Sequence, residues 1–249
     1  MTDFGTGDYY VGAMKGVILS INPNVSLVDI THDIETQNIA SAAFVLSACY
    51  RDFPPATIFV CVVDPGVGSD RRAIAVESND HKFVGPDNGL FSFILGPNVR
   101  VIAIENDQFF RQPISSTFHG RDIFAPVAAH LSRGIDLREL GHEIIDAVML
   151  PNIRPKRTDE NTLEGSVIHI DHFGNIVTNI TAEMVSDAFQ LEVDGRLIGD
   201  RREFYAGAEP GKLFTVMGSA GFIEISINGS SAAEKLGVKT GAPVIARLK

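Results

Sequence analysis

The stretch IFVCVVDPGVGSDRR, residues 58–72, decides the fold class of this chain. Its first six residues are apolar and mostly β-branched, a run too short for a helix but typical of a strand buried on both faces. Asp64 follows at the carboxyl end of that strand, ahead of Gly66 and Gly68. In open α/β sheets ligands bind outside the carboxyl ends of the strands, where glycines let the backbone approach closely. The stretch predicts an α/β protein with a candidate site here, and a plain surface turn capped by Asp64 is the alternative.

Strand and helix patterns alternate on both sides of this stretch, as they do in α/β domains. The loop-like segment TDFG, residues 2–5, precedes a helical pattern, so we also expect a strand ahead of residue 1. Asp122 is predicted to cap the last helix of this half and Gly134 to follow its end. The predicted strands are 25–31, 56–64, 73–79, 82–87 and 99–105, and the predicted helices are 10–21, 34–53 and 122–134.

The pattern of the sequence changes near residue 150. A polar stretch with two prolines, residues 150–163, interrupts the alternation of strand and helix patterns there. We therefore expect two domains, residues 1–152 and 163–249. The second consists mainly of short alternating segments separated by Gly, Asn and Asp, a pattern typical of a small β-barrel or sandwich. Its predicted strands are 165–171, 174–180, 189–195, 212–218, 221–227 and 242–248, with one short helix at 231–237.

Composition excludes several classes of partner. The 249 residues carry 21 basic and 31 acidic side chains, a formal charge of -10 that repels nucleic acid and anionic lipid. No apolar run reaches the roughly 18 residues needed to span a bilayer, and residues 1–30 show no export signal. The two cysteines, Cys49 and Cys61, lie in apolar patterns that favour buried free thiols, so the sequence predicts a cytoplasmic protein.

Motifs for common cofactors are missing from the chain. The sequence contains no GxxxxGK[ST], GxSxG or HExxH, and GTGDYYVG lacks the third glycine of a dinucleotide fingerprint. His169, Asp171 and His172 are metal-ligand types, but alternation along a strand directs His172 away from the other two. We therefore expect no metal site and no cofactor.

Seven segments, in this order along nearly the whole chain, closely resemble the S-adenosylmethionine (SAM) hydroxide adenosyltransferases, the water-using relatives of fluorinase and chlorinase. This resemblance implies a Rossmann-like N-terminal α/β sandwich domain that carries the catalytic residues. It also implies a C-terminal antiparallel β-barrel domain that contacts adenine and methionine, and a homotrimer with SAM bound between subunits. The segments are TDFG with YVGAMKG, DITHDI, VVDPGVGSDRRAI, VGPDNGL, TFHGRDIFAPVAAHL, DHFGNIVTNI and GSAGFIEISIN.

The same resemblance implies roles for individual residues. Asp64, Arg71 and His119 match the set associated with water activation in the hydroxide-transferring branch, a set that the halogenating branch lacks. Asp3 matches the residue that grips the ribose hydroxyls, and Asp8 lies in the same turn. The barrel domain supplies the remaining matches, namely Asn175 at the adenine edge with Phe173 beside it, the polar contacts Asp171, Ser219 and Glu224, and the backbone of Ile227.

The activity implied is hydrolysis of SAM to adenosine and L-methionine, by displacement at C5′ with an activated water or hydroxide. SAM is then the substrate, and neither a cofactor nor a metal is required. Three alternatives stay open at this point: an adenosyl halide synthase of the same fold, a non-catalytic adenosine or SAM sensor, and a metal-dependent phosphohydrolase that uses the many aspartates.

Overall fold

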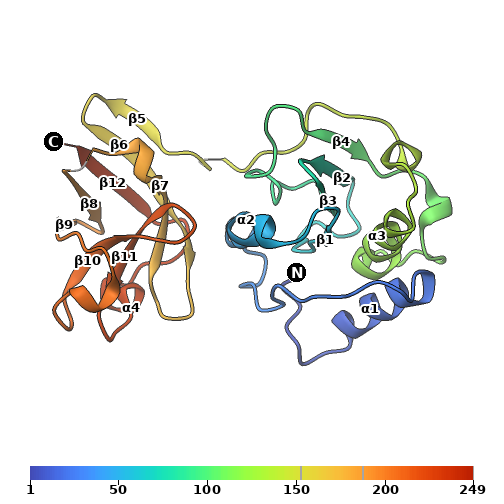
Figure 1. Ribbon diagram of the computed structural model, residues 1–249, viewed down its shortest axis with the longest axis horizontal. Coiled ribbons are helices and arrows are strands. Elements are labelled where there is room, and N and C mark those ends of the chain that lie inside the picture. The colour runs from blue at the N-terminus through green and yellow to red at the C-terminus, as the bar shows by residue number, and fades with distance from the viewer. Residues whose placement is uncertain (152, 187, 249) are drawn as a thin grey trace. The chain divides into compact units, whose positions relative to one another are not determined.

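The computed structural model describes residues 1–151, 153–186 and 188–248, and the chain divides into two compact units, residues 1–150 and 151–249 (Figure 1). The division falls inside the polar stretch 150–163. That stretch is not all linker, because Lys156–Asp159 forms strand β5 and pairs with the strand that follows it. All four residues of β5 are exposed, so they carry no apolar alternation that could have predicted a strand.

The first unit contains a four-stranded sheet in the order β1-β3-β2-β4. β1 runs parallel to β3, whereas β2 is antiparallel to both of its neighbours. The sheet is therefore mixed rather than parallel throughout, because β2 and β3 form a hairpin and not a crossover. The strands are β1 Ile58–Val60, β2 Ala73–Ser78, β3 His81–Pro86 and β4 Arg100–Ala103.

Helices cover both faces of this sheet (Figure 1). Helices α1 (Tyr10–Ile21) and α3 (Ala125–Ser132) contribute to one apolar core, and α2 (Ile39–Cys49) contributes to a second. Successive residues of the 58–63 segment alternate between the two cores, since a strand directs neighbouring side chains to opposite faces. This arrangement confirms the α/β sandwich and explains why that segment is apolar at every position.

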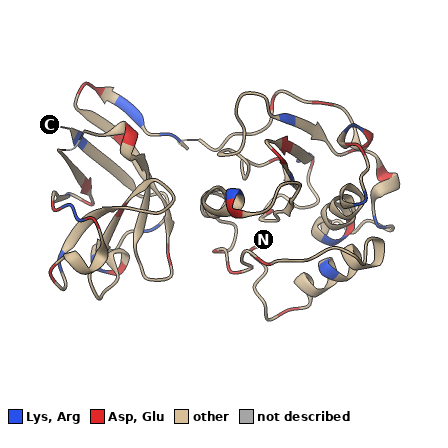
Figure 2. Cartoon of the chain, in the orientation of Figure 1, with Lys and Arg blue, Asp and Glu red and all other residues tan. Residues whose placement is uncertain are grey.

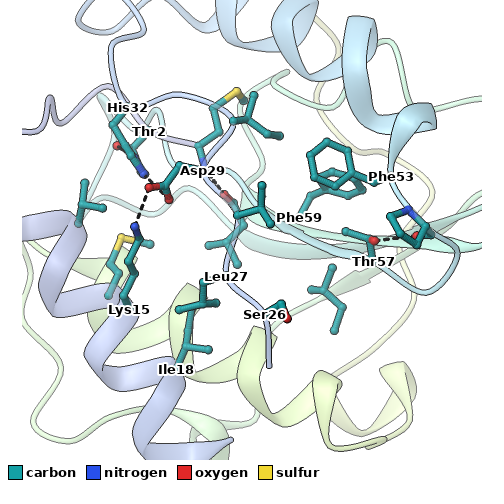
Figure 3. A pocket seen from close by; sticks show the side chains of 18 residues that line it. Thr2, Lys15, Ile18, Ser26, Leu27, Asp29, His32, Phe53, Thr57 and Phe59 are labelled. Carbon is teal, nitrogen blue, oxygen red and sulfur yellow. Dashed lines mark hydrogen bonds and ion pairs between the residues drawn. The ribbon is translucent and has the colours of Figure 1, made fainter. Parts of the chain in front are cut away.

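Residues 25–31 do not form the predicted strand. No backbone hydrogen bond joins residues 25–30 to another part of the chain that the structure describes, and only Thr31 accepts one, from Thr2 N at 3.1 Å. A mainly apolar pocket of about 290 Å³ lies between this segment and β1 (Figure 3). At its edge Lys15 Nζ donates to Asp29 Oδ2 at 2.6 Å. The prediction is wrong because an apolar pattern shows only that a segment could pack as a strand. Here Leu27 and Val28 are exposed, and no neighbouring strand among the described residues pairs with the segment.

The helix predicted over residues 122–134 begins earlier than its pattern indicates. A π-helical turn, Gly120–Phe124, runs directly into α3, so Asp122 lies inside the helical segment and is not its N-cap. The Asp122 side chain binds arginines instead, a competing use that spacing does not reveal. Gly134 does follow the helix, with φ of +91°, as predicted.

The second unit is a nearly closed antiparallel barrel. Its strands follow the order β10-β11-β7-β6-β12-β8-β9, with β5 beside β6. Arg201, just after β9, forms a bridge with Thr215 of β10, which brings the two ends of the sheet together. The sequence does not predict strand β9, because its three residues show no alternating pattern and no longer apolar run surrounds them, as one does for β1. The elements are β6 Thr162–Ile170, β7 Ile176–Thr181, β8 Phe189–Val193, β9 Arg196–Ile198, β10 Leu213–Met217, β11 Phe222–Ile227, α4 Ala232–Leu236 and β12 Pro243–Leu248.

The distribution of charge agrees with the sequence analysis, and the placement of the thiols agrees with it in part. Lys and Arg are scattered over both units rather than gathered along one element (Figure 2). Cys49 and Cys61 are both free thiols, as predicted. Cys61 is fully buried, and burial raises the pKa of its thiol to about 12, but Cys49 is only half-buried, so the predicted burial holds for Cys61 and not for Cys49. None of the helices in the described ranges combines the length and the apolar character needed to cross a membrane.

Candidate active site

Three polar side chains predicted as a set, Asp64, Arg71 and His119, lie together in the first unit. Arg71 Nε donates to Asp64 Oδ1 at 2.9 Å and to Oδ2 at 3.0 Å, and Arg71 Nη2 also contacts Asp64 Oδ2. The same Nη2 lies 2.8 Å from His119 Nδ1. The Asp64 and Arg71 side chains are only 4% and 11% exposed, so water screens this ion pair weakly. Arg71 thus connects a carboxylate and an imidazole in one hydrogen-bonded chain.

Two loops bring these side chains together. Asp64 directly follows the 58–63 segment, and a tight turn in which Ser69 N donates to Gly66 O at 3.1 Å returns the chain to Arg71. Gly68 in that turn has φ of +79°, and a Cβ there would collide with the carbonyl oxygen of Ser116. Only glycine permits this approach between the loop that carries Asp64 and the loop that leads to His119.

The hydrogen bond from Arg71 determines the proton position on His119. Arginine donates and cannot accept, so His119 Nδ1 must be the acceptor and the ring proton of the neutral imidazole sits on Nε2. Burial lowers the pKa of His119 below its ordinary value, and the neighbouring positive charge of Arg71 lowers it further. Both effects favour the neutral ring. The Arg71 guanidinium also lies over the Phe124 ring, 5.2 Å from its centroid, which restricts its movement.

The TDFG loop lies beside this set through aromatic contacts. Phe4 is 6.0 Å and Tyr10 is 5.1 Å, centroid to centroid, from Phe118, the residue before His119. Asp3 is half-buried and its Oδ2 accepts from Gln37 N at 2.9 Å. Asp8 is exposed. The structure therefore places Phe4, next to Asp3 in the chain, against the residue before His119, and leaves Asp8 on the surface of the first unit.

Four of the residues predicted in the barrel domain line one pocket of about 530 Å³ in the second unit. This volume lies within the usual range for small-molecule sites. Phe173 is 75% exposed at the pocket, which is unusual for a large apolar side chain and leaves its ring available for stacking. The four residues are Asp171, Phe173, Asn175 and Ile227, and Tyr205 joins them.

Asp171 organises the turn that carries the other pocket residues. Its Oδ1 accepts from Phe173 N at 2.9 Å and from Asn175 N at 2.8 Å, and its Oδ2 accepts from Asn175 Nδ2 at 2.8 Å. Gly174 between them has φ of +81°, and a Cβ there would collide with Ser231. Because Nδ2 faces Asp171, the Asn175 carboxamide is held with its oxygen directed away from that carboxylate.

Glu224 is buried and bound to a residue that the sequence analysis missed. Tyr205 Oη donates to Glu224 Oε2 at 2.9 Å. Burial raises the pKa of the Glu224 carboxyl, and burial together with this bond raises the pKa of Tyr205 to about 12. Tyr205 stands in a short 3-10 turn with no motif around it, so no sequence signal indicates its contact. Ser219 is exposed in the turn between β10 and β11 and does not line the pocket.

The candidate metal ligands do not converge. Among the described residues, no three His, Cys, Asp or Glu side chains are placed to hold one ion. Burial lowers the pKa of His169, and Asp171 is already engaged by the turn that it caps.

Comparisons with known proteins cover almost all of the chain. Residues 1–141 match the SAM hydroxide adenosyltransferase N-terminal domain, and residues 165–245 match the C-terminal domain of the same family. A protein of Thermus thermophilus named (R)-S-adenosyl-L-methionine hydrolase is 37% identical, and the match covers 98% of this chain and 96% of that protein. A fluorinase of Actinoplanes is 25% identical, with 98% of this chain and 95% of that protein covered.

A solved structure supports the same relationship. The structure of an uncharacterized conserved protein from Thermotoga maritima superposes with a TM-score of 0.89 at 37% identity, and the match covers 99% of this chain and 98% of that one. Sequence and structure thus agree over both units. This chain belongs to the SAM hydroxide adenosyltransferase family.

Proposed function

We propose that this chain hydrolyses SAM to adenosine and L-methionine, with water or hydroxide displacing methionine at C5′. The observation that carries the proposal is the bonded set of Asp64, Arg71 and His119. The identity of 37% to a protein named for this activity, over nearly the full length of both, supports it.

The substrate determines what the site must supply. SAM contains a sulfonium, so methionine leaves C5′ as a neutral thioether and needs no acid to protonate it. Water is a poor nucleophile, and the site must hold it in line with the C5′–S bond and accept its proton. In the single step the C5′–O bond forms, the C5′–S bond breaks with its electrons going to sulfur, and one proton passes from water to the site.

We assign separate tasks to the three side chains. The Asp64 carboxylate is the proton acceptor, because a carboxylate has about four lone-pair positions and Arg71 does not occupy them all. Arg71 holds Asp64 and His119 in fixed positions. His119 donates from Nε2 to the water oxygen, since its Nδ1 is already an acceptor and its Nε2 carries the proton.

The remaining residues are proposed to bind the substrate. Asp3 would accept from both ribose hydroxyls, with Asp8 in the same turn. Phe173 would stack on the adenine, and the Asn175 oxygen would accept from its exocyclic amine. The polar side chains of Asp171, Ser219 and Glu224 and the backbone of Ile227 complete the set.

The finer predictions about assembly and location remain part of the proposal. We infer a homotrimer that binds SAM between the first domain of one subunit and the second domain of its neighbour, and a cytoplasmic location. No cofactor or metal takes part in the proposed step. A sedimentation measurement should give three times the mass of one chain, and a monomer that is fully active would contradict the shared site.

The direct test is to incubate SAM with the pure protein in oxygen-18 water and separate the products. The label should appear in the 5′-hydroxyl of adenosine, with activity unchanged by EDTA. A 5′-halo-adenosine formed in the presence of chloride or fluoride would favour the halide synthase, and SAM left intact would favour the sensor. Activity that requires an added metal would contradict the metal-free step.

The pH profile is expected to reflect the neutral state of His119. Because burial and Arg71 lower the pKa of His119 below its ordinary value of about 6.5, protonation should reduce kcat/KM only below that pH. The stability that the neutral ring contributes should likewise be present above pH 6.5 and be lost as the pH falls through the lowered pKa. Rates measured from pH 5 to 8 check this. An acid limb with its midpoint above 6.5 would contradict the assignment.

Tyr205→Phe should weaken SAM binding without slowing the chemical step. The change removes the hydroxyl that donates to Glu224 Oε2 and leaves a buried carboxylate oxygen short of a partner. The pKa of Glu224, already raised by burial, should rise further because this bond lowers it. We expect KM to increase about tenfold, from the loss of a hydrogen bond to a charged group, with kcat unchanged. Tyr50→Phe, a buried tyrosine of the first unit, serves as the control.

A further inference from the structure

Asp122, in the π-helical turn before α3, carries a heavily hydrogen-bonded carboxylate that the proposed chemistry does not use. Its side chain is fully buried. Arg121 donates to Oδ1 from Nε at 2.7 Å and to Oδ2 from Nη2 at 2.9 Å. Arg111 Nη1 donates to Oδ1 at 3.2 Å, and Ser115 N donates to Oδ2 at 2.9 Å. Four donors therefore converge on one buried anion.

Two of these donors come from the segment that leads to His119, and the other two come from Arg121, which follows it. Ser115 and Arg111 belong to the loop before it, and Arg111 N also donates to the backbone oxygen of Asp122 at 2.8 Å. Asp122 itself lies three residues beyond His119, in the π-helical turn Gly120–Phe124. Such turns are rare in proteins, and those that occur are often found at functional sites. The carboxylate thus joins the stretches on either side of His119.

Arg121 extends this connection to the aromatic residues beside the TDFG loop. Its guanidinium lies 5.0 Å from the centroid of the Phe118 ring, directly before His119. Phe118 in turn contacts Phe4 of that loop. The Arg121 guanidinium is bonded to Asp122 on one side and stacks on Phe118 on the other, so it connects the residue before His119 with the turn after it.

The buried carboxylate remains charged in this setting. Burial opposes ionisation, but the bonds from Arg121 and Ser115 outweigh it and lower the pKa of Asp122. Removing one partner from such a set is expensive, because it leaves a buried charge without compensation. The carboxylate and its donors therefore stay bonded at neutral pH.

We propose that Asp122 is a positioning residue that holds His119 with Nδ1 facing Arg71. The inference rests on the proposed function only for its effect on turnover. The geometric part, a fixed tautomer of His119, stands whether or not the chain hydrolyses SAM.

Asp122→Asn is the first test, because it keeps the shape and replaces one acceptor oxygen by a donor that faces other donors. We expect a change in the nitrogen-15 NMR signals of the His119 ring, recorded without substrate. In the unaltered protein they should be those of a single tautomer, with an accepting Nδ1 and a protonated Nε2, and in the variant they should be an average over both tautomers. At saturating SAM, kcat should fall about 100-fold, the usual effect of a displacement of roughly 1 Å. KM should stay within a factor of about three, since binding groups are untouched.

Arg121→Lys is the second variant, in case the first does not fold. It keeps the positive charge but removes the two-pronged hydrogen bonding of the guanidinium to Asp122. The His119 signals should therefore shift toward the average of both tautomers, by a smaller amount than in Asp122→Asn. Asp136→Asn is the matched control, because Asp136 binds Arg138 in the same two-pronged way on the surface, 3.0 Å from Nε. It should leave the His119 signals and kcat unchanged.

The NMR readout separates this inference from the proposed function. If a folded Asp122→Asn or Arg121→Lys chain keeps the His119 signals of the unaltered protein, Asp122 has only a structural role and the inference is wrong. If the signals change while the unaltered chain shows no SAM hydrolysis, the positioning role holds and the proposed function fails.

Discussion

Asp64→Asn is expected to lower kcat for SAM hydrolysis by about 10²- to 10⁴-fold, the usual contribution of a general base. The substitution keeps the shape of the side chain and its oxygen facing Arg71, but the amide cannot accept the proton of the attacking water. KM should change little, because Asp64 is not among the groups proposed to bind the nucleoside or methionine. Product formation at saturating SAM, separated by chromatography, measures the effect.

The same change should also destabilise the first unit. Arg71 is 11% exposed and would be left as a nearly buried cation with one weakened partner. Breaking a buried pair from one side costs about 3–5 kcal/mol as a general expectation, and thermal unfolding should show a lower midpoint. Turnover must therefore be measured well below that midpoint.

Asp87→Asn supplies the control for this effect. Asp87 is a similarly buried carboxylate, and it accepts at 2.8 Å from Nε of Arg72, the residue that follows Arg71. Its loss should lower the unfolding midpoint while kcat stays within a factor of about three. If Asp64→Asn retained more than a tenth of the original kcat, Asp64 would not be the proton acceptor.

The sequence predicts the sheet and helix layers of the first unit well, but it predicts less well which segments pair as strands. The 58–63 segment is apolar at every position because its side chains enter both cores, and that pattern is readable from the chain alone. Residues 25–31 also contain a strand-like apolar pattern but have no partner strand in the part of the chain that the structure describes, since pairing depends on a neighbour that no local pattern reports. Strand β5 is missed for the opposite reason, because it is paired but exposed.

In the candidate site, too, the sequence indicates some of the contacts and not others. The contact of Asp64 with Arg71 spans seven positions in one turn, and glycine spacing indicates that turn. His119 lies 48 positions beyond Arg71, so only the family resemblance connected it to the others. Asp122 was misread as a helix cap because the two uses of an aspartate near a helix start have the same spacing. Tyr205 carries no pattern at all.

Gly68→Ala should disrupt the set without altering any of its three side chains. At φ of +79° an alanine is strained by about 1–2 kcal/mol, and its Cβ would also meet the Ser116 carbonyl oxygen, a backbone atom that cannot rotate away. The loop that carries Asp64 and Arg71 must then move away from the loop that leads to His119. We expect a shift of about 1 Å, a fall in kcat of about 100-fold and a lower unfolding midpoint.

Gly211→Ala separates the two causes. Gly211 has nearly the same φ, +77°, but a Cβ there meets no atom within 4 Å, so this variant carries the backbone strain without the collision. Its unfolding midpoint should fall less than that of Gly68→Ala, and its kcat should be unchanged. Equal losses of stability in the two variants, with full turnover in both, would mean that the approach of the two loops does not hold Arg71 against His119. A larger loss of stability in Gly68→Ala, together with slow turnover, is expected if the close approach of the two loops sets the distance from Arg71 Nη2 to His119 Nδ1.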